Sequence, residues 1–388
     1  MTIEILFWIL NGLLIYSYLI YPLGMSLAVY VTGKADSLSS EQFFPDVSVL
    51  LSVHNEASVI EGKIRSVFNS DYPADKLELI VGSDNSTDDT NRILEDLSSQ
   101  FDSLSYIPFE KRRGKPEVIN DIRKHAKGTI LIITDADVLP ERETIRMIVA
   151  PFNDPETGLV DSIIRIVQDD SREINVQEKT YQYLESRLKE NESRLSGCMM
   201  GPSGGFYAIR NDLYEDVPPN HLVDDFFICM KILQKGYKTI VTSEAAVKSN
   251  LSSGLKEEYR RKIRISAGNY QNLSHFSGLL LRPWKRLAFR FISHKVLRWI
   301  GPQLYIIALT LNVIMLKTSF IYFLLFIIQL ILILLPALDL LLQRLRIKLV
   351  PLRFLTHFCI MNLALLAGFF RFIGGIRSGI WKPTKRVV

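Results

Sequence analysis

The sequence predicts an α/β domain of the doubly wound type, with transmembrane α-helices at both ends of the chain. Between residues 47 and 150, apolar runs typical of buried strands alternate with segments of helical spacing. Polar residues follow the carboxyl ends of these strands, which is where ligands bind in doubly wound sheets. Only 22% of the residues are charged, the mean hydropathy is +0.14, and the apolar excess lies near the two ends of the chain.

Composition narrows the class of protein further. The 388 residues are enough for about two domains. Cys198, Cys229 and Cys359 are too few and too scattered for a disulfide framework or a zinc site. The net charge is +5, and much of the basic excess follows Arg260. This distribution favours membrane lipids or anionic phosphates as partners, and it argues against nucleic acid as a partner.

The first element, Ile3–Val31, is almost wholly apolar and exceeds the roughly 20 residues that a helix needs to cross a bilayer. A signal peptide would need a basic start and a small-residue cleavage site, and neither is present. We therefore expect residues 1–33 to form a transmembrane helix, with a buried helix of a soluble core as the alternative. The first basic residue, Lys34, follows this segment, so the positive-inside rule places the next domain in the cytoplasm.

The domain that follows, residues 45–275, begins with strands and helices in alternation. The run Val47–Val53 predicts a buried parallel strand, and Ser58–Ser70 has helical spacing of its apolar residues. A second strand, Leu77–Val81, ends in a polar loop whose Thr87 or Asp88 can cap the next helix. No GxGxxG pattern follows the first strand, which argues against a classical dinucleotide-binding domain.

The stretch Leu131–Pro140 carries the pattern that points most directly to chemistry. A buried strand runs into Thr134-Asp135-Ala136-Asp137, and residues i and i+2 of an extended tip point to the same side. Asp135 and Asp137 can therefore face one cation, and two carboxylates in this position are costly without a positive charge. Mg²⁺ or Mn²⁺, shared with a diphosphate, suits this pair. An acidic turn after a strand is the alternative.

The second half of the domain predicts further elements and two polar sites. The elements are a helix at Glu143–Ala150, a strand at Gly158–Val167, a long amphipathic helix at Glu173–Leu195 and a helix at Phe226–Lys235. The glycines of Gly201–Gly205 cannot continue a helix, but they let a backbone approach a sugar ring. Asp224 and Asp225 open the last helix, where acidic residues are also common because of the helix dipole.

Six motifs resemble, in order, those of family 2 glycosyltransferases, whose catalytic domains have the GT-A fold. They are SVHNE, GSDNSTDDT, RRGKPEVIN at Arg112–Asn120, TDADV, GPSGGFYAIR at Gly201–Arg210 and LVDDFF at Leu222–Phe227. The resemblance runs from about Pro45 to Asn272. It implies a doubly wound mixed sheet of GT-A type and a metal-dependent, inverting hexosyltransferase that uses Mg²⁺ or Mn²⁺.

The resemblance assigns donor-binding roles to five residues, which are Glu56, Asp84, Arg113, Lys115 and Asp135. Asp84 can accept a hydrogen bond from an imide N–H such as uracil offers, and Glu56 would contact the same base or its ribose. The basic loop would lie on the diphosphate, and Asp137 with Asp135 would hold the metal. The family usually has Asp-Asp-Gly-Ser where this chain has SDNS, so Ser83 replaces the first aspartate. The alternatives are an Asx-turn at Asp84 and a solvated basic loop.

The acceptor side follows from the later motifs. Asp225 matches the general base of the family's Glu-Asp pair, and Asp224 takes the place of the glutamate. Gly204 and Gly205 would lie against the acceptor or the diphosphate. Processive members carry QxxRW, in which Arg264 matches the arginine, whereas the glutamine and the tryptophan are missing. This argues against processive synthesis and leaves Arg264 as an acceptor or diphosphate contact.

The C-terminal part of the chain predicts membrane association. Residues 276–298 alternate basic and apolar residues and predict an interfacial amphipathic segment. The spanning candidates within residues 299–376 are Trp299–Leu316, Thr318–Leu342 and Phe354–Phe370, and a basic tail follows at 377–388. Four spans would put this tail outside the cell, whereas its basic residues argue for the inside. We therefore expect one segment to be re-entrant or interfacial.

Together these patterns predict an inverting glycosyltransferase that crosses the cell (inner) membrane several times, with its catalytic domain in the cytoplasm. It would move a sugar from a nucleotide-diphosphate sugar, a UDP-sugar, to a hydroxyl of a glycan or lipid-linked acceptor in cell-envelope or exopolysaccharide biosynthesis. One alternative is a processive polysaccharide synthase that also secretes its product. Another is a catalytically dead GT-A membrane scaffold, against which the intact acidic motifs argue. A transporter would need more polar residues within its spans.

Overall fold

The structure is a computed structural model, and the chain divides into two compact units. The described residues are 2–33, 43–166, 175–249, 255–345, 347, 349–376 and 379. The sheet unit comprises Ala28–Ser171, Glu185–Ser253 and Ile376–Val388, and the helical unit comprises Met1–Leu27, Arg172–Leu184 and Gly254–Gly375. The linker before residue 43 and most of the predicted basic tail lie outside the described residues.

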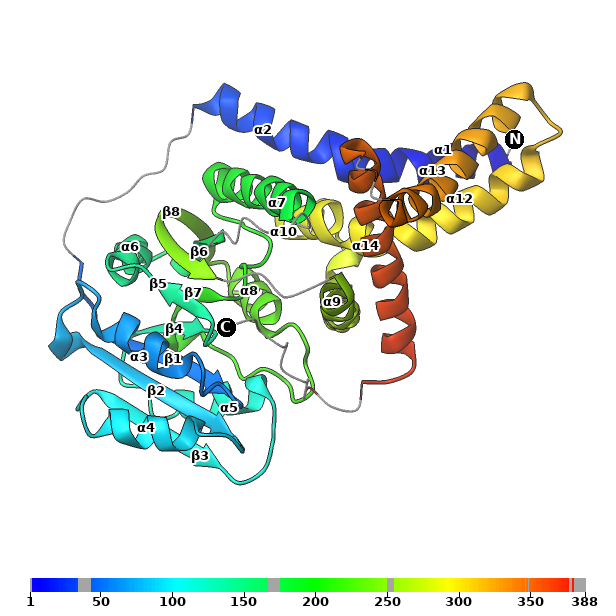
Figure 1. Ribbon diagram of the computed structural model, residues 1–388. Coiled ribbons are helices and arrows are strands. Elements are labelled where there is room, and N and C mark those ends of the chain that lie inside the picture. The colour runs from blue at the N-terminus through cyan, green and yellow to red at the C-terminus, as the bar shows by residue number, and fades with distance from the viewer. Residues whose placement is uncertain are drawn as a thin grey trace. The chain divides into compact units, whose positions relative to one another are not determined.

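The sheet unit is built around one mixed β-sheet, which contains eight strands in the described residues (Figure 1). The strands are β1 (Val47–Val53), β2 (Leu77–Asp84), β3 (Leu104–Phe109), β4 (Ile130–Thr134), β5 (Val138–Pro140), β6 (Thr157–Ile166), β7 (Phe206–Arg210) and β8 (Lys238–Ser249). Their order in the sheet is β3-β2-β1-β4-β7-β6-β8-β5. The first four are parallel, whereas β7 runs antiparallel to both β4 and β6.

Helices lie between successive strands of the chain. They are α3 (Ile60–Phe68), α4 (Thr90–Ser98), α5 (Lys115–Arg123), α6 (Thr144–Val149), α7 (Asn175–Ser196) and α8 (Asp224–Gln234). Of these, α3, α4, α5, α6 and α8 pack against strands of the sheet. The apolar residues of α3 at helical spacing, among them Ile60, Ile64 and Val67, are fully buried against the sheet. Every residue of β1 except Ser52 is also buried, as expected for a parallel strand covered on both faces.

The predicted alternation of strands and helices is confirmed, with one shift that matters for the site. The second strand does not end at Val81 but continues through Asp84, because Gly82–Asp84 pairs with Ile107–Phe109 of β3. The strand order reverses at β1, with β2 and β3 on one side of it and β4 on the other. The carboxyl ends of β1, β2 and β4 share one edge of the sheet, which is the ligand-binding edge of doubly wound folds.

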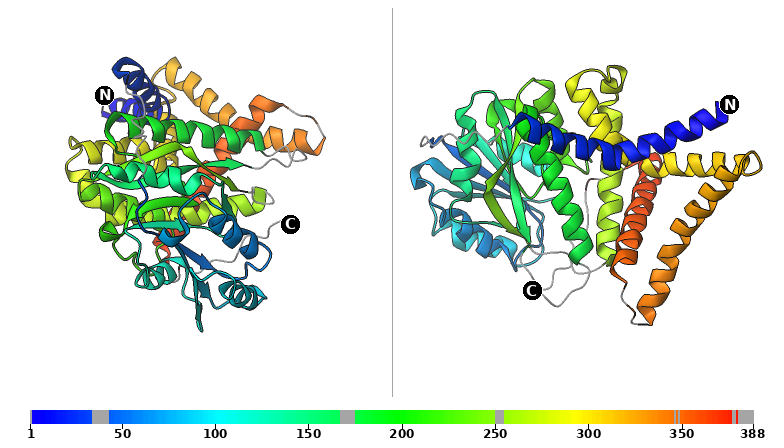
Figure 2. Two further views of the ribbon diagram at one scale, coloured as in Figure 1. Left: turned by 90° about the vertical axis from the view of Figure 1, so that its left-hand side faces the viewer. Right: turned by 90° about the horizontal axis from the view of Figure 1, so that it is seen from above.

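Apart from Ala28–Thr32, which belongs to the sheet unit, the helical unit contains the apolar helices that the sequence predicts at both ends of the chain. Among the described residues, three helices are long and apolar enough to cross a membrane: Thr2–Thr32, Phe320–Arg344 and Val350–Ile373. The first comprises α1 (Thr2–Ile15), the π-helical turn η1 (Tyr16–Ile20) and α2 (Tyr21–Thr32), and the others are α13 and α14. Figure 2 shows α13 and α14 side by side, with α9 (Leu255–His275) packed on α14. The contacts of α9 thus group it with these helices.

The predicted span Trp299–Leu316 is not a single straight helix. The helix α12 (Gly301–Met315) has 15 residues and is long enough for a span only together with the preceding segment, from which it bends by 64°. Pro302 lies at the start of α12, where a proline interrupts the helical hydrogen bonding of the residues before it. This bent pair is therefore either a broken span or a re-entrant element.

The predicted amphipathic helix at residues 276–298 is also broken. The segment contains α10 (Arg286–Arg290), the π-helical η6 (Phe291–Val296) and the start of α11 (Leu297–Trp299). Phe291 is fully buried in the helical unit, and Ser293 Oγ lies 2.8 Å from Tyr16 OH. Because η6 makes these contacts within the helical unit, it does not present the free apolar face that the sequence predicts for this segment. The segment's exposed large apolar residues, Leu280, Leu281, Trp284 and Phe289, precede η6.

Candidate active site

The loops after β1 and β2 are joined by a ladder of hydrogen bonds. Asn55 Oδ1 accepts from Thr87 N at 2.8 Å, and Glu56 N donates to Thr90 Oγ1 at 2.9 Å. Asn55 adopts a positive φ of 56°, which asparagine tolerates better than most residues. These contacts hold the buried Glu56 beside the end of the strand that carries Asp84. The two residues predicted to contact the donor base therefore lie at the carboxyl ends of neighbouring strands, Glu56 after β1 and Asp84 at the end of β2.

Asp84 organises the basic loop of the RRGKPEVIN motif. Its carboxylate accepts from Arg113 N at 2.7 Å and from Gly114 N at 2.9 Å. Gly114 has φ of 94°, which a side chain would oppose, and it directly precedes α5. The Arg113 guanidinium turns along α5 and pairs with Asp121 and Glu117. The structure thus brings this loop to Asp84 through its backbone, whereas the Arg113 side chain pairs with acidic residues of the following helix.

Lys115 lies at the centre of the acidic motifs. Its Nζ donates to Asp135 Oδ1 at 2.7 Å and lies 4.0 Å from Asp224 Oδ2, and its side chain is 18% exposed. Burial opposes the charge, but Asp135, Asp224 and Asp225 together raise the pKa of Lys115. The lysine is therefore a permanent cation that joins the tip of β4 to the start of α8.

The tip of β4 fits a divalent metal that takes further ligands from its substrate. Asp135 and Asp137 follow β4 directly, and the Asp135 side chain is 43% exposed while one of its oxygens meets Lys115. Among the described residues, no third His, Cys, Asp or Glu joins a cluster able to hold a metal alone. Mg²⁺ and Mn²⁺ often bind through one or two carboxylates, with phosphate and water completing the shell. The hard oxygen donors present suit such an ion.

Asp225 faces the glycine loop at the start of α8. Gly204 has φ of 84°, and a Cβ built on it would overlap Asp225 Oδ2, so only glycine lets this loop approach the carboxylate. Asp225 Oδ1 accepts from Phe226 N at 2.7 Å. Burial and the neighbouring Asp224 raise the pKa of Asp225 to about 7, against the opposing charges of Lys115 and Lys189. A carboxylate with this pKa can accept a proton near neutral pH.

A buried network behind the glycine loop was not predicted. Asp161 of β6 accepts from Ser203 N at 2.8 Å and from Ser203 Oγ at 3.0 Å, and Lys189 of α7 lies 3.7 Å from the same carboxylate oxygen. A charged residue inside the apolar strand Gly158–Val167 was the available signal for Asp161. Tyr207 was also missed, and its buried hydroxyl has no hydrogen-bond partner among the described residues. Burial and then Asp224 and Asp225 raise the pKa of Tyr207.

Arg264 and the other predicted site residues belong to different compact units of the chain. Arg264 belongs to α9 in the helical unit, whereas Asp225 and the glycine loop belong to the sheet unit. Its assignment to the acceptor or the diphosphate stays a prediction.

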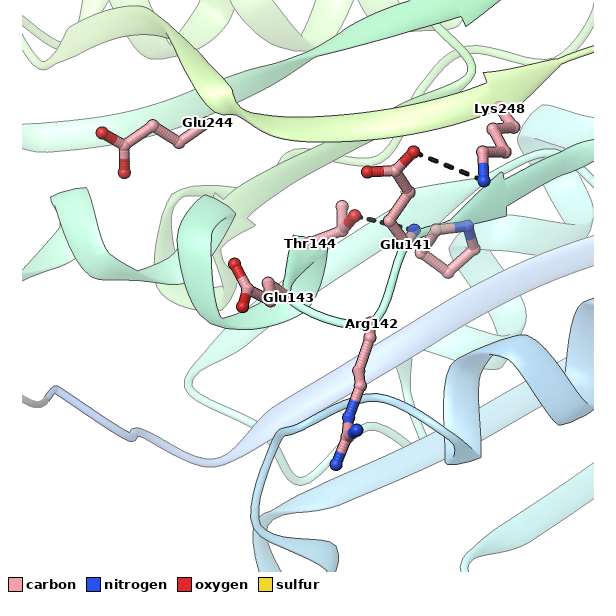
Figure 3. Close-up of a pocket in the computed structure, with 7 residues that line it drawn as sticks. Glu141, Arg142, Glu143, Thr144, Glu244 and Lys248 are labelled. Carbon is pink, nitrogen blue, oxygen red and sulfur yellow. Dashed lines mark hydrogen bonds and ion pairs between the residues drawn. The ribbon is translucent and has the colours of Figure 1, made fainter. Parts of the chain in front are cut away.

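One hollow of about 450 Å³ in the sheet unit lies next to the segment that follows the TDADV motif (Figure 3). It is lined by Pro140, Glu141, Arg142, Glu143, Thr144, Glu244 and Lys248. Figure 3 shows Glu141 paired with Lys248, and its backbone N–H bonded to Thr144. None of the predicted site residues lines this hollow, so we do not assign the donor to it.

Comparison with known proteins identifies a matching family and several relatives. Residues 48–217 match the family described as glycosyl transferase family 2. The probable glycosyltransferase YdaM of Bacillus subtilis is 25% identical over 257 residues, which are 63% of this chain and 60% of that protein. The beta-monoglucosyldiacylglycerol synthase of Synechocystis sp. is 30% identical over 134 residues, which are 33% of this chain and 26% of the synthase. The chain thus spans under two thirds of the length of both relatives.

A solved structure supports the fold along nearly the whole chain. The mannosyltransferase PcManGT from Pyrobaculum calidifontis, in complex with GDP-Man and Mn²⁺, matches 95% of this chain and 99% of its own with a TM-score of 0.70 and 23% identity. The likeness is one of fold. Residues 48–217 therefore match a glycosyl transferase family 2 domain, and the mixed α/β sheet that contains them has the GT-A fold.

Proposed function

We propose that this glycosyltransferase is membrane-anchored and inverting, and that it transfers a sugar from a UDP-sugar to a hydroxyl of a glycan or lipid-linked acceptor. The observation that carries the proposal is the position of Lys115, which bonds Asp135 at 2.7 Å and lies 4.0 Å from Asp224. A single cation thus links the predicted metal-binding motif to the motif that contains the predicted base. Such an arrangement suits a leaving diphosphate and an attacking hydroxyl in one site.

The donor side of the proposal rests on Glu56, Asp84 and the loop that ends at Lys115. Each carboxylate oxygen of Asp84 accepts one backbone N–H and keeps a further lone pair, so Asp84 can also accept an imide N–H of uracil. Asp135 and Asp137 would hold Mg²⁺ or Mn²⁺, which when bound supplies Lewis-acid stabilisation of the charge on the leaving diphosphate. Lys115 adds a second positive charge on the same side.

The acceptor side of the proposal rests on Asp225 and the glycine loop. The Asp225 carboxylate accepts the proton of the acceptor hydroxyl while the hydroxyl oxygen forms a bond to the anomeric carbon of the donor sugar. The bond from that carbon to the diphosphate breaks in the same displacement, which inverts the anomeric centre. The nucleotide diphosphate leaves with the electron pair, and Asp225 holds the proton until product release. Such base assistance contributes about 10²–10⁴-fold to the rate.

The proposed setting is the cell (inner) membrane, with the sheet unit in the cytoplasm, where the product would serve the cell envelope or an exopolysaccharide. The three membrane-length helices support membrane anchoring. The exposed Trp284 and Leu281, next to the basic Arg282, Lys285 and Arg286, support contact with anionic lipid headgroups. The lost QxxRW pattern supports a non-processive enzyme.

The decisive experiment is hydrolysis of a panel of UDP- and GDP-sugars by the purified full chain, with and without Mn²⁺. We expect hydrolysis of a UDP-sugar that stops in EDTA and returns with Mn²⁺. The variant Asp137→Asn should lose more than about 10²-fold of this activity, since metal stabilisation is worth several kcal/mol. Full activity in EDTA, or a wild-type rate in Asp137→Asn, would refute the metal assignment. Selective cleavage of a GDP-sugar would instead show that the donor carries guanine and not uracil.

A further inference from the structure

We infer that Lys63 is a positioning residue that fixes the metal loop, Thr134–Val138, against the glycine loop, Gly201–Gly205. Lys63 lies on α3, outside every motif discussed so far. The inference rests on the proposed function, because it gives Lys63 a role only if Asp135 and Asp137 hold a metal ion.

The contacts of Lys63 enclose the metal loop from both ends. The side chain is fully buried, and its Nζ donates to Thr134 Oγ1 at 2.8 Å and to the carbonyl of Val138. These two acceptors flank Asp135, Ala136 and Asp137 in the sequence. One ammonium group therefore sets the span of the backbone that carries both carboxylates.

The same connection continues into the glycine loop. Thr134 Oγ1, which accepts from Lys63, donates to Gly205 O at 3.0 Å, and Asp135 N donates to that carbonyl at 3.0 Å as well. The neighbouring Gly204 is the residue that lies against the Asp225 carboxylate. A chain of contacts from Lys63 thus relates the position of the metal carboxylates to that of the predicted base.

A residue that only fills space in the core would not need the ammonium group of Lys63. Its hydrogen-bond acceptors are neutral, and its Nζ lies 5.3 Å from the centre of the Phe206 ring. A buried lysine costs free energy, and an apolar side chain of similar volume is often as stable or more stable. Burial lowers the pKa of Lys63 to about 7, while Asp135 and Asp137 act in the opposite direction. A methionine would fill this space but would supply no hydrogen bond to the metal loop.

The test uses four variants of the purified full chain. Lys63→Met removes the ammonium, and Thr134→Val removes the hydroxyl that links it to Gly205. Thr134→Ser keeps that hydroxyl and is the matched control. Lys76→Met is a second control, because Lys76 also donates to a backbone carbonyl, Phe44 O at 2.7 Å, away from the site motifs. For each variant we would measure Mn²⁺ binding in the presence of UDP, UDP binding without metal, and thermal unfolding.

We expect Lys63→Met and Thr134→Val to weaken Mn²⁺ binding by about 10- to 100-fold, as is typical when outer-shell partners of a metal site are lost. UDP binding without metal and the unfolding temperature should stay close to wild type. Thr134→Ser and Lys76→Met should bind Mn²⁺ as the wild type does.

The outcomes separate the two proposals. If the wild type does not bind Mn²⁺ with UDP or with GDP, the proposed function fails. If the wild type binds and Lys63→Met binds equally well, the inference is overturned. An equal loss of metal-free UDP binding would also overturn it, because the effect would then be general to the domain. Should Lys63→Met not fold, Thr134→Val against Thr134→Ser decides, and equal Mn²⁺ affinity in these two refutes the inference.

Discussion

At the scale of single residues, Lys115 and Asp225 are both largely buried, but their neighbours give them different protonation behaviour. Lys115 has two carboxylates within 4.0 Å, so its charge persists although its side chain is only 18% exposed. Asp225 shares its surroundings with a second carboxylate, Asp224, so its pKa rises to about 7. One site thus contains a fixed cation, which we propose to face a diphosphate, and a carboxylate that can take up a proton near neutral pH.

The first prediction concerns Asp225→Asn. This variant should bind UDP-sugar as the wild type does but lose about 10²–10⁴-fold in transfer, because the base acts on the acceptor. The wild-type transfer rate should rise with pH up to about 7, where Asp225, whose pKa is raised, becomes deprotonated. Isothermal calorimetry and the pH profile of transfer would check this. An equal loss of UDP binding would move Asp225 to the donor site.

The raised pKa of Asp225 also has a consequence for stability. The ordinary aspartate pKa is about 3.9, so the folded chain binds the extra proton between about pH 4 and 7. The wild type therefore loses stability as the pH rises through this window. Asp225→Asn has no such loss, and its unfolding temperature relative to wild type should be higher at pH 8 than at pH 4.

The second prediction concerns the pair Lys189 and Asp161, whose side chains are 9% and 1% exposed. Lys189→Met leaves a buried carboxylate without its cation and should cost about 3–5 kcal/mol of unfolding free energy. Adding Asp161→Asn should restore most of this loss, because the uncompensated charge is gone. Urea unfolding of both single variants and the double variant would measure the coupling. Additive losses in the double variant would show that the two charges are independent.

The residues that the sequence did not predict share one property. Lys63, Asp161 and Lys189 lie outside the recognised motifs, and the fold brings their side chains into contact with the loops of the candidate site. Lys63 interrupts the apolar spacing of Ile60, Ile64 and Val67, and this charge on a buried helical face was a usable sign. The partner of each charge could not be found, because the partners lie far along the chain.

At the scale of elements, the glycine loop is defined by backbone conformation more than by side chains. Gly204 has φ of 84° and Gly236 has φ of 89°, but a Cβ on Gly204 would overlap Asp225 whereas a Cβ on Gly236 would meet open space. The two positions therefore separate backbone strain from crowding at the base.

The third prediction uses this difference. Gly204→Ala and Gly236→Ala should each cost about 1–2 kcal/mol of stability, because alanine is disfavoured at positive φ. Only Gly204→Ala should also lower the transfer rate, since it displaces the Asp225 carboxylate. Thermal unfolding and transfer assays of both variants would test this. A similar loss of transfer in Gly236→Ala would attribute the effect to strain alone.

The elements that sequence patterns missed are those defined by long-range pairing. The strand β3 was not predicted, although it extends β2 as far as Asp84. The antiparallel β7 was not predicted either, because the glycines that precede it mask the five-residue strand. The π-helical break at η6 depends on contacts with a segment more than 270 residues away, such as Ser293 with Tyr16. Helical periodicity alone cannot reveal such a partner.

At the scale of the whole molecule, the fourth prediction concerns attachment to lipid. Arg282, Lys285 and Arg286 are exposed beside Trp284, and each basic residue near an anionic leaflet is worth about 1 kcal/mol. Replacing these three with Gln should slow transfer to a lipid-linked acceptor in anionic vesicles and leave hydrolysis of the donor unchanged. A control with Gln at the exposed Arg65 and Arg92 should behave as wild type. An equal fall in hydrolysis would assign the segment to the catalytic core.

The last prediction concerns the number of spans, which the bent pair α10–α12 leaves at three or four. If the pair crosses the membrane, the turn at Ser319 and the C-terminus lie outside, against the basic residues of the tail. If it is re-entrant, Lys317 and the tail stay inside, and the basic loop before α14 lies outside.

The buried contacts of η6 and the 64° bend favour the re-entrant arrangement, with three spans and an internal C-terminus. A cysteine at the exposed Ser319, in a chain without the three native cysteines, should then resist membrane-impermeant thiol reagents in intact cells. A cysteine at the exposed Ser99, which caps the C-terminus of α4, is the cytoplasmic reference, and both should react after permeabilisation. Labelling of Ser319→Cys alone in intact cells would establish four spans. Labelling at Ser99 would invert the whole arrangement, because the positive-inside rule would then have failed at the first span.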